Sequence, residues 1–463
     1  MKKRTRGVFA RLVILWILLL AIGGFFCYVL FARADGAQLT EYFNSPFVNT
    51  ETMYLLLAFC ILLMIGLIAL LRSTIYTASK VKDIRRAWDR YEKKVSKKKA
   101  KNAPRFNMLN MIDHEFDGHA KKKTMYNETI TLEEICESFR NYAASQLHLY
   151  YRIEDIRRFI AGLGVSKLMI LQGMSGTGKT SLAYAMGHFL QNDSVVVPVQ
   201  PMWKERSDMI GYFNEFTKRF NETTLLRKMY EAGYKEDLYI TILDEVNISR
   251  IEYYFAEFLS LLEIPDESKR YLDVVSDVWP NDPVKLDHGR ILLPANMWFI
   301  GTANNDDSTF AISDKVYDRA MVLSLEHKCE PFEAETAEPI RLSHGHWTEL
   351  IRQAKETYAL SKENEKKIRA LDRYLIDTFH MSFGNRIMKQ MYEYVPVMMA
   401  CGGKEDQAID DVLVRKVFRK LETQNPSFIR NSMDGLKDYI IGLFGPQAMP
   451  QCLEYLEMLK NTL

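Results

Sequence analysis

A glycine-rich stretch near the middle of the chain has the residue types and the spacing of a phosphate-binding loop. Residues 173–180 read Gly-Met-Ser-Gly-Thr-Gly-Lys-Thr and fit the pattern GxxxxGK[ST]. The glycines let backbone N–H groups approach phosphate oxygens at the N-terminus of the next helix. In such a loop the lysine contacts the β- and γ-phosphates, and the final hydroxyl binds Mg²⁺. The predicted nucleotide-binding residues are therefore Gly173, Ser175, Gly176, Thr177, Gly178, Lys179 and Thr180.

Two adjacent carboxylates follow an apolar segment farther along the chain. Residues 239–245 read Tyr-Ile-Thr-Ile-Leu-Asp-Glu, which predicts a strand that ends at Asp244 and Glu245. Ligands bind at the carboxyl ends of the strands in open α/β sheets. Asp244 is predicted to hold Mg²⁺, directly or through water, and Glu245 to polarise the attacking water. This strand pattern is common by itself, but after a phosphate-binding loop it indicates hydrolysis rather than binding alone.

Both motifs depend on strands and helices that the surrounding pattern predicts. Residues 167–172 form a short apolar run before a glycine and are predicted to be a buried strand, and residues 181–190 an amphipathic helix. This context disfavours a glycine-rich turn that binds nothing. Helix and strand signals alternate to about residue 325, and the pattern is helical from there to the end. We therefore expect an α/β fold with a parallel sheet, preceded by helices within 131–163 and followed by a helical lid.

Length and composition place these motifs in a chain of two to three globular domains. The chain has 463 residues, of which 48% are hydrophobic and 26% are charged, close to globular averages. The net charge of +2 does not indicate a strongly basic nucleic-acid binder, but the charge is unevenly spread, because residues 72–105 hold thirteen Lys/Arg against three Asp/Glu. No two of the six cysteines form a CxxC pair, which excludes a disulfide scaffold and a local zinc module.

Two uncharged segments near the N-terminus are long enough to cross a membrane. Residues 12–32 and 53–71 contain 21 and 19 uncharged residues, which makes helices of roughly 31 and 28 Å. A cleaved signal peptide is the alternative for the first segment, and Arg33 disfavours it by interrupting the cleavage pattern. Cationic residues flank the pair, whereas the loop of residues 34–52 has no Lys or Arg. We therefore expect two transmembrane helices in the inner or plasma membrane, with the bulk of the chain cytoplasmic.

The segment that follows the predicted membrane hairpin is a basic neck. Cations in residues 79–105 would attract anionic lipid headgroups, at about 1 kcal/mol per charge near the surface. Direct nucleic-acid binding and a plain solvated helix are the alternatives. Residues 106–125 are mixed and polar, and we expect them to be a linker.

Taken together, the motifs resemble those of AAA+ ATPases, in the branch that contains the McrB restriction motor and the MoxR-type chaperones. Residues 244–250, Asp-Glu-Val-Asn-Ile-Ser-Arg, are similar to that branch's Asp-Glu-Ile-Asn-Arg stretch, although Arg250 comes two places later than the arginine there. Residues 297–304, Met-Trp-Phe-Ile-Gly-Thr-Ala-Asn, resemble its sensor 1 strand. The resemblance implies that Asn304 helps to orient the hydrolytic water. Capping of the loop after the strand is the alternative role.

Two arginines extend the resemblance. Arg319 lies where the family carries an arginine finger, which implies that it reaches the γ-phosphate bound to a neighbouring subunit. Residues 383–386, Phe-Gly-Asn-Arg, resemble the start of a sensor 2 helix, which implies that Arg386 contacts nucleotide. Surface salt bridges are the alternative for both arginines.

Two further segments bear on how such a domain would contact a substrate. In AAA+ rings the loops after the second strand often face the pore, and here that segment carries Trp203, Tyr212 and Phe213. Packing of these aromatic rings against a neighbouring helix is the alternative. Residues 263–293 are an insertion before the sensor strand, and we expect a projecting hairpin there.

The resemblance covers residues 150–400 and implies an ATPase whose Mg²⁺-dependent hydrolysis remodels a macromolecular partner, for example as the motor of a McrBC-like defence system. GTP is an alternative to ATP, because McrB prefers GTP. A nucleotide-gated membrane scaffold with little turnover is the alternative outside the enzymes. The expected partners are copies of the same chain in a ring such as a hexamer, the membrane, and an unidentified protein or effector.

These expectations divide the chain into four parts. Residues 1–75 are the transmembrane hairpin and residues 76–125 are the basic neck and linker. Residues 126–328 are the AAA+ α/β core with its leading helices. Residues 329–463 are the helical lid and the last helices.

Overall fold

The computed structural model describes most of the chain beyond residue 102 and part of what precedes it. The chain divides into two compact units, Met1–Lys98 and Lys99–Leu463. The described residues are residue 21, many positions between 58 and 90, and then 103–117, 124–304, 309–326 and 328–462.

In the first unit, one helix among the described residues has the length and the apolar composition needed to cross a membrane. This helix is Ile61–Trp88, and the side chains of its apolar part are not buried. It begins within the second predicted span, residues 53–71, and continues into the basic neck. The first predicted span, residues 12–32, lies outside the described residues except at one position. A pair of membrane-spanning helices therefore stays a prediction.

The second unit is built on a five-stranded sheet with the strand order β10-β1-β9-β5-β2. Every neighbouring pair of strands in this sheet is parallel, as the alternating sequence pattern predicts. The strands are β1 (Leu168–Gly173), β2 (Val195–Pro198), β5 (Tyr239–Asp244), β9 (Met297–Asn304) and β10 (Met321–Ser324).

Alternate residues of the strands face two different hydrophobic clusters. Met169 and Leu171 of β1 belong to one cluster, whereas Leu168 and Ile170 belong to the other. Successive side chains of a strand point to opposite faces, so a strand covered on both faces must be apolar throughout. The first cluster contains α5 (Leu132–Leu147), α6 (Ile153–Val165) and α7 (Lys179–Phe189), and the second contains α9 (Thr224–Ala232), α10 (Ile251–Tyr254), α11 (Ala256–Leu262) and α12 (Asp314–Tyr317).

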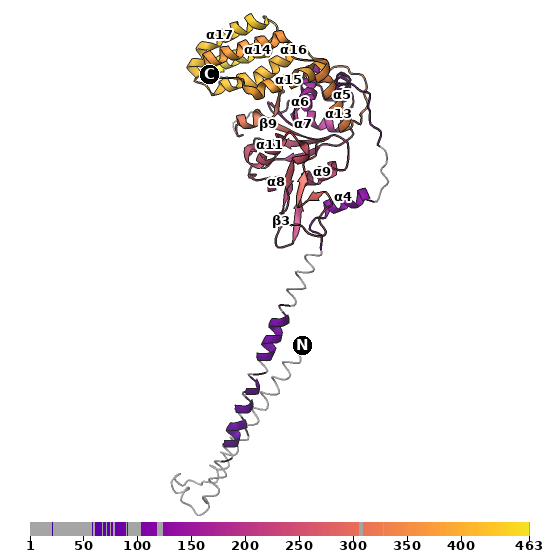
Figure 1. Ribbon diagram of the computed structural model, residues 1–463, viewed down its shortest axis with the longest axis vertical. Helices are drawn as coiled ribbons and strands as arrows, with labels where there is room; N and C mark the ends of the chain where they lie inside the picture. Colours follow the sequence, from indigo (N-terminus) through magenta and orange to yellow (C-terminus); the bar gives the residue numbers. More distant parts are fainter. Residues whose placement is uncertain are drawn as a thin grey trace, which may run out of the picture. The chain divides into compact units, whose positions relative to one another are not determined.

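The chain is predominantly helical from His344 onward, and these helices form the predicted lid, but residues 328–342 contain no helix, so the lid helices begin later than predicted. Figure 1 shows α14, α16 and α17 gathered at one end of this unit, with β3 at the opposite end. The lid residues belong to the same hydrophobic cluster as α5, α6 and α7, so the lid and the sheet share one core. The lid elements are α13 (His344–Thr357), α14 (Lys362–Phe379), α15 (Gly384–Ala400), α16 (Glu405–Val412), the π-helix η2 (Leu413–Val417), η3 (Phe418–Thr423), α17 (Pro426–Phe444) and α18 (Pro450–Thr462).

Two small antiparallel sheets lie outside the main sheet. One is the hairpin of β3 (Gly211–Asn214) and β4 (Arg219–Glu222), which follows the short helix α8 (Arg206–Ile210). The other occupies the predicted insertion, residues 263–293, and so contains the expected hairpin. Its elements are η1 (Glu267–Lys269), β6 (Tyr271–Asp273), β7 (Leu286–Asp287) and β8 (Arg290–Leu292).

The three aromatic residues proposed to face a pore divide between packing and exposure. Trp203 packs edge-to-face on Tyr254, with ring centroids 5.6 Å apart. Phe213 packs on the ring of Trp279 in the same way, at 5.8 Å. Tyr212 is exposed. Packing therefore accounts for two of the three rings.

The prediction of a linker at residues 106–125 is wrong for its first half. These residues include α4 (Met108–Asp117), which packs on α9 with its apolar face buried. The Glu222 carboxylate accepts hydrogen bonds of 2.8, 3.0 and 2.9 Å from three backbone N–H groups at the start of this helix. Just before it, Arg105 is buried and forms a salt bridge of 2.7 Å with Asp282. The segment has a polar composition because hydrogen bonds and a salt bridge of its own residues hold it against the rest of this unit.

Candidate nucleotide-binding site

The predicted phosphate-binding loop lies between β1 and α7, and its backbone requires glycine. At Gly173, φ is +145°, and a Cβ there would come within 2.3 Å of the Leu325 carbonyl oxygen. Gly176 and Gly178 have φ values of +80° and +88°. The Tyr151 hydroxyl donates to the Gly178 carbonyl oxygen at 3.0 Å, and burial raises the pKa of Tyr151, which keeps that hydroxyl a donor. The loop is thus fixed at both ends.

Side chains of the loop shape it further. The buried Lys179 donates to the carbonyl oxygens of Gly173 and Met174, at 3.0 and 2.7 Å. The Thr177 hydroxyl donates to the Met174 carbonyl oxygen at 3.0 Å. Ser175 is exposed at the tip of the loop. All the predicted phosphate-binding residues therefore lie in one loop and the first turn of the helix after it.

Two hydroxyl groups join this loop to the predicted carboxylates. The Thr180 and Thr302 hydroxyls both donate to the same oxygen of Asp244, at 2.9 and 2.8 Å. A hydroxyl beside a carboxylate is the donor set that Mg²⁺ uses in phosphate-binding loops, where phosphate oxygens and water complete its shell. In the described parts of the chain, no three His, Cys, Asp or Glu side chains gather around one point. The Thr180–Asp244 pair therefore fits a Mg²⁺ ion that is held jointly with phosphate.

Glu245 follows directly, in a conformation that the sequence did not reveal. Its φ is +55°, which is uncommon for a residue with a side chain and costs of order 1 kcal/mol or more. The Glu245 N–H donates to the Thr302 hydroxyl at 2.9 Å, which holds this turn in place. The Glu245 side chain is exposed, next to the half-buried Asp244. A strained residue of this kind is typical of functional sites.

Thr302 is the site residue that the sequence reasoning missed. It is buried in β9, where its hydroxyl accepts from the Glu245 N–H and donates to Asp244. Its backbone carbonyl oxygen also accepts from the Val246 N–H at 2.8 Å. The available signal was a hydroxyl residue in an otherwise apolar strand, two places before the predicted sensor Asn304.

We expect Thr302→Val to lower turnover by about ten- to hundredfold, because a buried hydroxyl that holds two predicted site residues, Asp244 and Glu245, is lost. Nucleotide affinity should change less, since the phosphate-binding loop is intact. Steady-state phosphate release measures both effects, and Thr302→Ser should restore most of the activity. The matched control is Thr241→Val in β5, because the Thr241 hydroxyl is buried and has no partner in the described part of the chain. Equal losses in both valine variants would contradict a specific role for Thr302.

The predicted sensor residue lies beside the loop. Strands β1 and β9 are adjacent, and Asn304 pairs in register with Gly173. The Asn247 side-chain amide donates to the Asn304 carbonyl oxygen at 2.7 Å, which connects the loop after Asp244 to the end of the sensor strand. Gly173, Asn304 and Asp244 thus stand at the carboxyl ends of three neighbouring strands, β1, β9 and β5.

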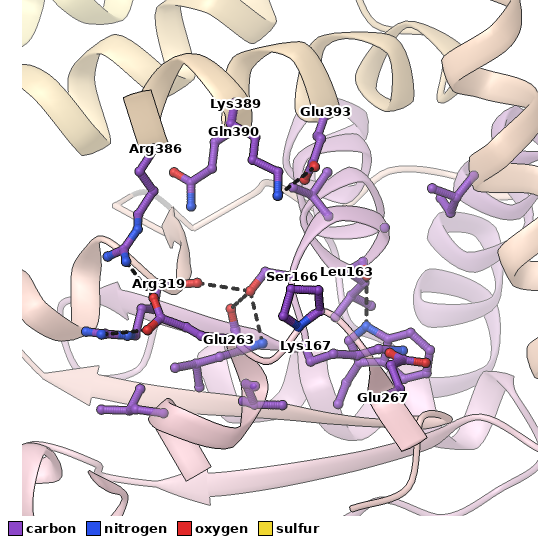
Figure 2. A pocket seen from close by; sticks show the side chains of 18 of the residues that line it. Leu163, Ser166, Lys167, Glu263, Glu267, Arg319, Arg386, Lys389, Gln390 and Glu393 are labelled. Atoms are coloured by element: carbon purple, nitrogen blue, oxygen red, sulfur yellow. Dashed lines mark hydrogen bonds and ion pairs between the residues drawn. The ribbon is translucent and has the colours of Figure 1, made fainter. Parts of the chain in front are cut away.

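The structure does not bring Arg319 and Arg386 to this loop. Arg319 precedes β10, whose Met321 pairs with Met169 near the start of β1. The phosphate-binding loop is at the other end of β1, roughly 17 Å away along the strand. Arg386 lies with Arg319, because both guanidinium groups bind the carboxylate of Glu263, at 2.6 and 2.7 Å (Figure 2). A contact of Arg386 with the nucleotide of its own chain does not agree with this position.

A parallel sheet with a phosphate-binding loop after β1 and a hydroxyl–carboxylate pair for Mg²⁺ defines a P-loop nucleotide-binding domain. Residues 168–320 match the family model of the AAA domain, dynein-related subfamily. The chain therefore contains an AAA+ ATPase-type domain, and the predicted resemblance is confirmed at that level. The finer assignment to the McrB and MoxR branch stays a prediction.

Solved structures with a related arrangement are distant. A protein from Cytophaga hutchinsonii, described as an unconfirmed ATPase, is 15% identical with a TM-score of 0.41, over 61% of this chain and 84% of that one. A full-length MCM homologue from Methanopyrus kandleri is 11% identical with a TM-score of 0.33, over 61% of this chain and 59% of that one. No curated protein matches the chain.

Proposed function

We propose that this chain is an AAA+ ATPase that hydrolyses the β–γ bond of ATP with Mg²⁺ and uses the energy to remodel a macromolecular partner. The observation that carries the proposal is the hydrogen-bonded set of Thr180, Asp244 and Thr302, with Glu245 next to it. This set joins the phosphate-binding loop to a second carboxylate. A protein that only binds nucleotide does not need that second carboxylate.

Each residue of the site has a distinct role in this proposal. Lys179 would bind the β- and γ-phosphates, while Thr180 and Asp244 would hold a Mg²⁺ ion, which would supply positive charge beside the transferred group. Glu245 accepts the proton of the attacking water, and Asn304 orients that water. Together they position the nucleotide and the water, which is the main requirement of phosphoryl transfer.

We further propose that Arg319 and Arg386 act on the nucleotide of a neighbouring copy of the chain. Their place at the amino ends of the strands supports this, because it is far from the loop of their own chain and is partly open to solvent. Each complete site then needs two subunits, so a ring such as a hexamer is the expected assembly. The motif resemblance favours work on a protein partner or effector in the manner of McrB-type or MoxR-type motors, with ATP as the nucleotide.

Phosphate release from the full-length chain in detergent tests the proposed reaction. We expect Mg²⁺-dependent release with ATP, and we expect the Lys179→Ala variant to bind and hydrolyse neither ATP nor GTP. Nucleotide binding by the wild-type chain with no release above the Lys179→Ala background would contradict the ATPase and favour a nucleotide-gated scaffold.

We also propose that the N-terminal unit anchors the chain in the inner or plasma membrane. The apolar helix Ile61–Trp88 and the cations that line its second half support this. A basic segment beside a bilayer is attracted to anionic headgroups.

The proposed topology predicts which residues are reachable from outside intact cells. A single cysteine placed within residues 36–50 should react with a membrane-impermeant reagent, because the loop lacks the cations that keep a segment inside. A cysteine added after the last residue should react only after lysis. Labelling of the C-terminal cysteine in intact cells would overturn the cytoplasmic assignment.

A further inference from the structure

A cavity of about 820 Å³ opens at the amino ends of the strands, at the edge of the sheet opposite the phosphate-binding loop. Figure 2 shows its walls: the first turns of α15 on one side, and the ends of α6 and α11 with the start of β1 on the other. It holds the two arginines together with carboxylates and lysines. The charged residues among those that line it are Lys167, Glu263, Glu267, Arg270, Asp318, Arg319, Arg386, Lys389 and Glu393.

Glu263 is shared between the two arginines. One carboxylate oxygen accepts from Arg319 at 2.7 Å, and the other binds Arg386 at 2.6 Å. Arg319 is further held by a hydrogen bond of 2.7 Å to the Lys315 carbonyl oxygen. We call this arrangement the Glu263 bridge. It brings a residue from the end of α11, one from the start of β10 and one from the lid to a single point.

The charge of the bridge is not balanced. One carboxylate faces two guanidinium groups, and the buried Nε of Arg319 has no hydrogen-bond partner within the described residues. The first turn of α15, which carries Arg386, contains no acidic residue of its own, although a helix N-terminus favours an anion. The position of the Glu263 carboxylate therefore suits a group with more negative charge and more acceptor oxygens, such as a phosphate.

Lys167, another cation that lines the cavity, does not compete for this position. Lys167 donates to the Ala295 carbonyl oxygen, and its amine lies 3.4 Å from the centre of the Trp298 ring. Burial lowers the pKa of Lys167 to about 7, so a large share of this side chain is uncharged near neutral pH. Arg270 and Lys389, the remaining cations that line the cavity, each have a carboxylate of their own, Glu267 and Glu393. Arg319 and Arg386, which share one carboxylate, are therefore the cations best placed to bind an anion here.

We infer that the Glu263 carboxylate occupies the place that the γ-phosphate of a neighbouring subunit takes after assembly. In an unassembled chain, Glu263 holds Arg319 and Arg386 together. It is displaced when the nucleotide of a second copy enters the cavity. This inference rests on the proposed function, because it needs both arginines to act between subunits. Glu263 is then a positioning residue that competes with assembly. Removing its charge should make nucleotide-dependent assembly easier, whereas loss of a structural support would make it harder.

The test is the protein concentration at which the full-length chain in detergent assembles with Mg²⁺ and a non-hydrolysable ATP analogue, measured by sedimentation. We expect Glu263→Gln to assemble at about a three- to tenfold lower concentration than the wild type, as for the loss of two partly exposed ion pairs. Glu263→Asp keeps the charge but has a shorter side chain, so its assembly concentration should fall between those of the wild type and Glu263→Gln. It also tests the role of Glu263 if the glutamine variant folds poorly. Glu267→Gln is the matched control, because Glu267 lines the same cavity but pairs with Arg270.

The outcomes separate this inference from the proposed function. Equal or weaker assembly of folded Glu263→Gln, in a wild-type chain that assembles and hydrolyses ATP, would overturn the role of Glu263 alone. Assembly of Glu267→Gln at an equally low protein concentration would also overturn the role of Glu263, since the loss of any negative charge in the cavity would then be enough to favour assembly. A wild-type chain that neither assembles with the analogue nor releases phosphate would overturn both.

Discussion

Arg319→Ala is expected to lower ATP turnover by about 10³–10⁵-fold, the range for arginine fingers in related enzymes. The guanidinium group opposes the charge that develops on the transferred phosphoryl group, and water in its place does so far less well. Nucleotide binding by the unassembled Arg319→Ala chain should be unchanged, because Arg319 is at the opposite end of β1 from the phosphate-binding loop of its own chain. Phosphate release and nucleotide binding by fluorescence measure the two effects.

A mixing experiment shows whether Arg319 acts between subunits. Arg319→Ala chains and Glu245→Gln chains should each be inactive alone. In mixed assemblies, some interfaces combine an intact Glu245 with an intact Arg319 of the neighbour, so activity should partly return. No recovery in verified mixed assemblies, or full activity of Arg319→Ala alone, would remove Arg319 from the mechanism.

A surface arginine gives the matched control for this substitution. Arg352 on α13 also bridges two carboxylates, Glu349 and Glu356, but it is exposed and lies outside the cavity. Arg352→Ala should therefore keep wild-type turnover, since exposed pairs contribute little. Arg250, which follows Glu245 closely, is the next candidate finger if Arg319→Ala proves active.

Glu245→Gln is expected to keep nucleotide binding and to lower turnover by about 10²–10⁴-fold, the usual effect of removing a positioned general base. The glutamine keeps the shape of the side chain and the backbone bond to Thr302, but it cannot accept a proton from water. The variant should therefore hold ATP and accumulate in the assembled form. Single-turnover phosphate release separates this loss of chemistry from slow product release.

The control for Glu245→Gln must remove a carboxylate without touching the site. Glu257→Gln serves, because Glu257 pairs with Arg206 on the surface at 2.7 Å. It should keep wild-type turnover. Near-normal hydrolysis by the Glu245→Gln variant would show that another group activates the water.

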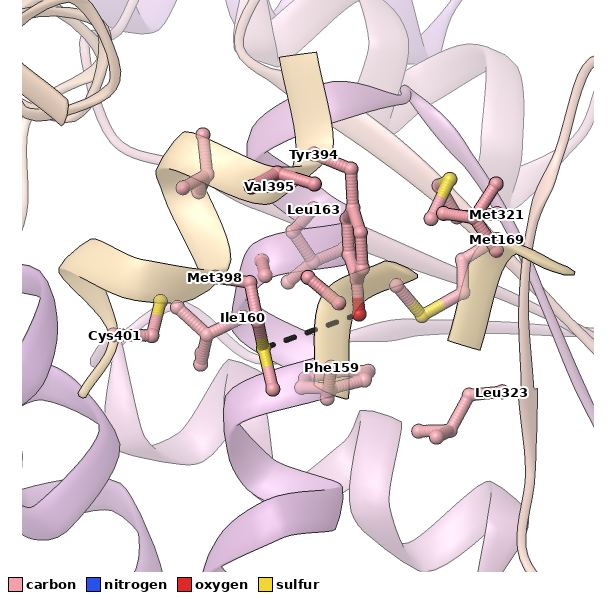
Figure 3. Close-up of a cluster of buried hydrophobic side chains, with 14 of the residues drawn as sticks. Phe159, Ile160, Leu163, Met169, Met321, Leu323, Tyr394, Val395, Met398 and Cys401 are labelled. Atoms are coloured by element: carbon pink, nitrogen blue, oxygen red, sulfur yellow. Dashed lines mark hydrogen bonds between the residues drawn. The ribbon is translucent and has the colours of Figure 1, made fainter. Parts of the chain in front are cut away.

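The lid illustrates what a helical pattern leaves undecided. The sequence predicted helices after residue 328, and the structure contains them, but their packing partners could not be read from spacing. Figure 3 shows Tyr394, Val395 and Met398 of α15 against Phe159 and Ile160 of α6. An apolar stripe specifies that a face is buried without specifying against what. That packing is what carries Arg386 away from the phosphate-binding loop.

The local motifs could be predicted from the sequence because their chemistry depends on residues that are neighbours in the chain. The loop from Gly173 to Thr180 needs positive φ at defined places and a helix directly after it, and the strand before Asp244 needs only an apolar run. Parallel strands align their carboxyl ends, so the sequence alone placed the loop, the carboxylates and Asn304 at one edge.

Contacts between distant residues were decided only by the tertiary structure. Thr302 became part of the site because β9 lies between β1 and β5, an order that strand propensity does not encode. Arg319 and Arg386 met at Glu263 because the first turns of α15 lie beside the start of β1 and the end of α11. The sequence by itself determined an α/β domain with a phosphate-binding loop and a carboxylate for which we propose a hydrolytic role. The fold determined which side chains hold that carboxylate in place and which arginines lie away from the loop of their own chain, because those depend on the packing of segments far apart in the chain.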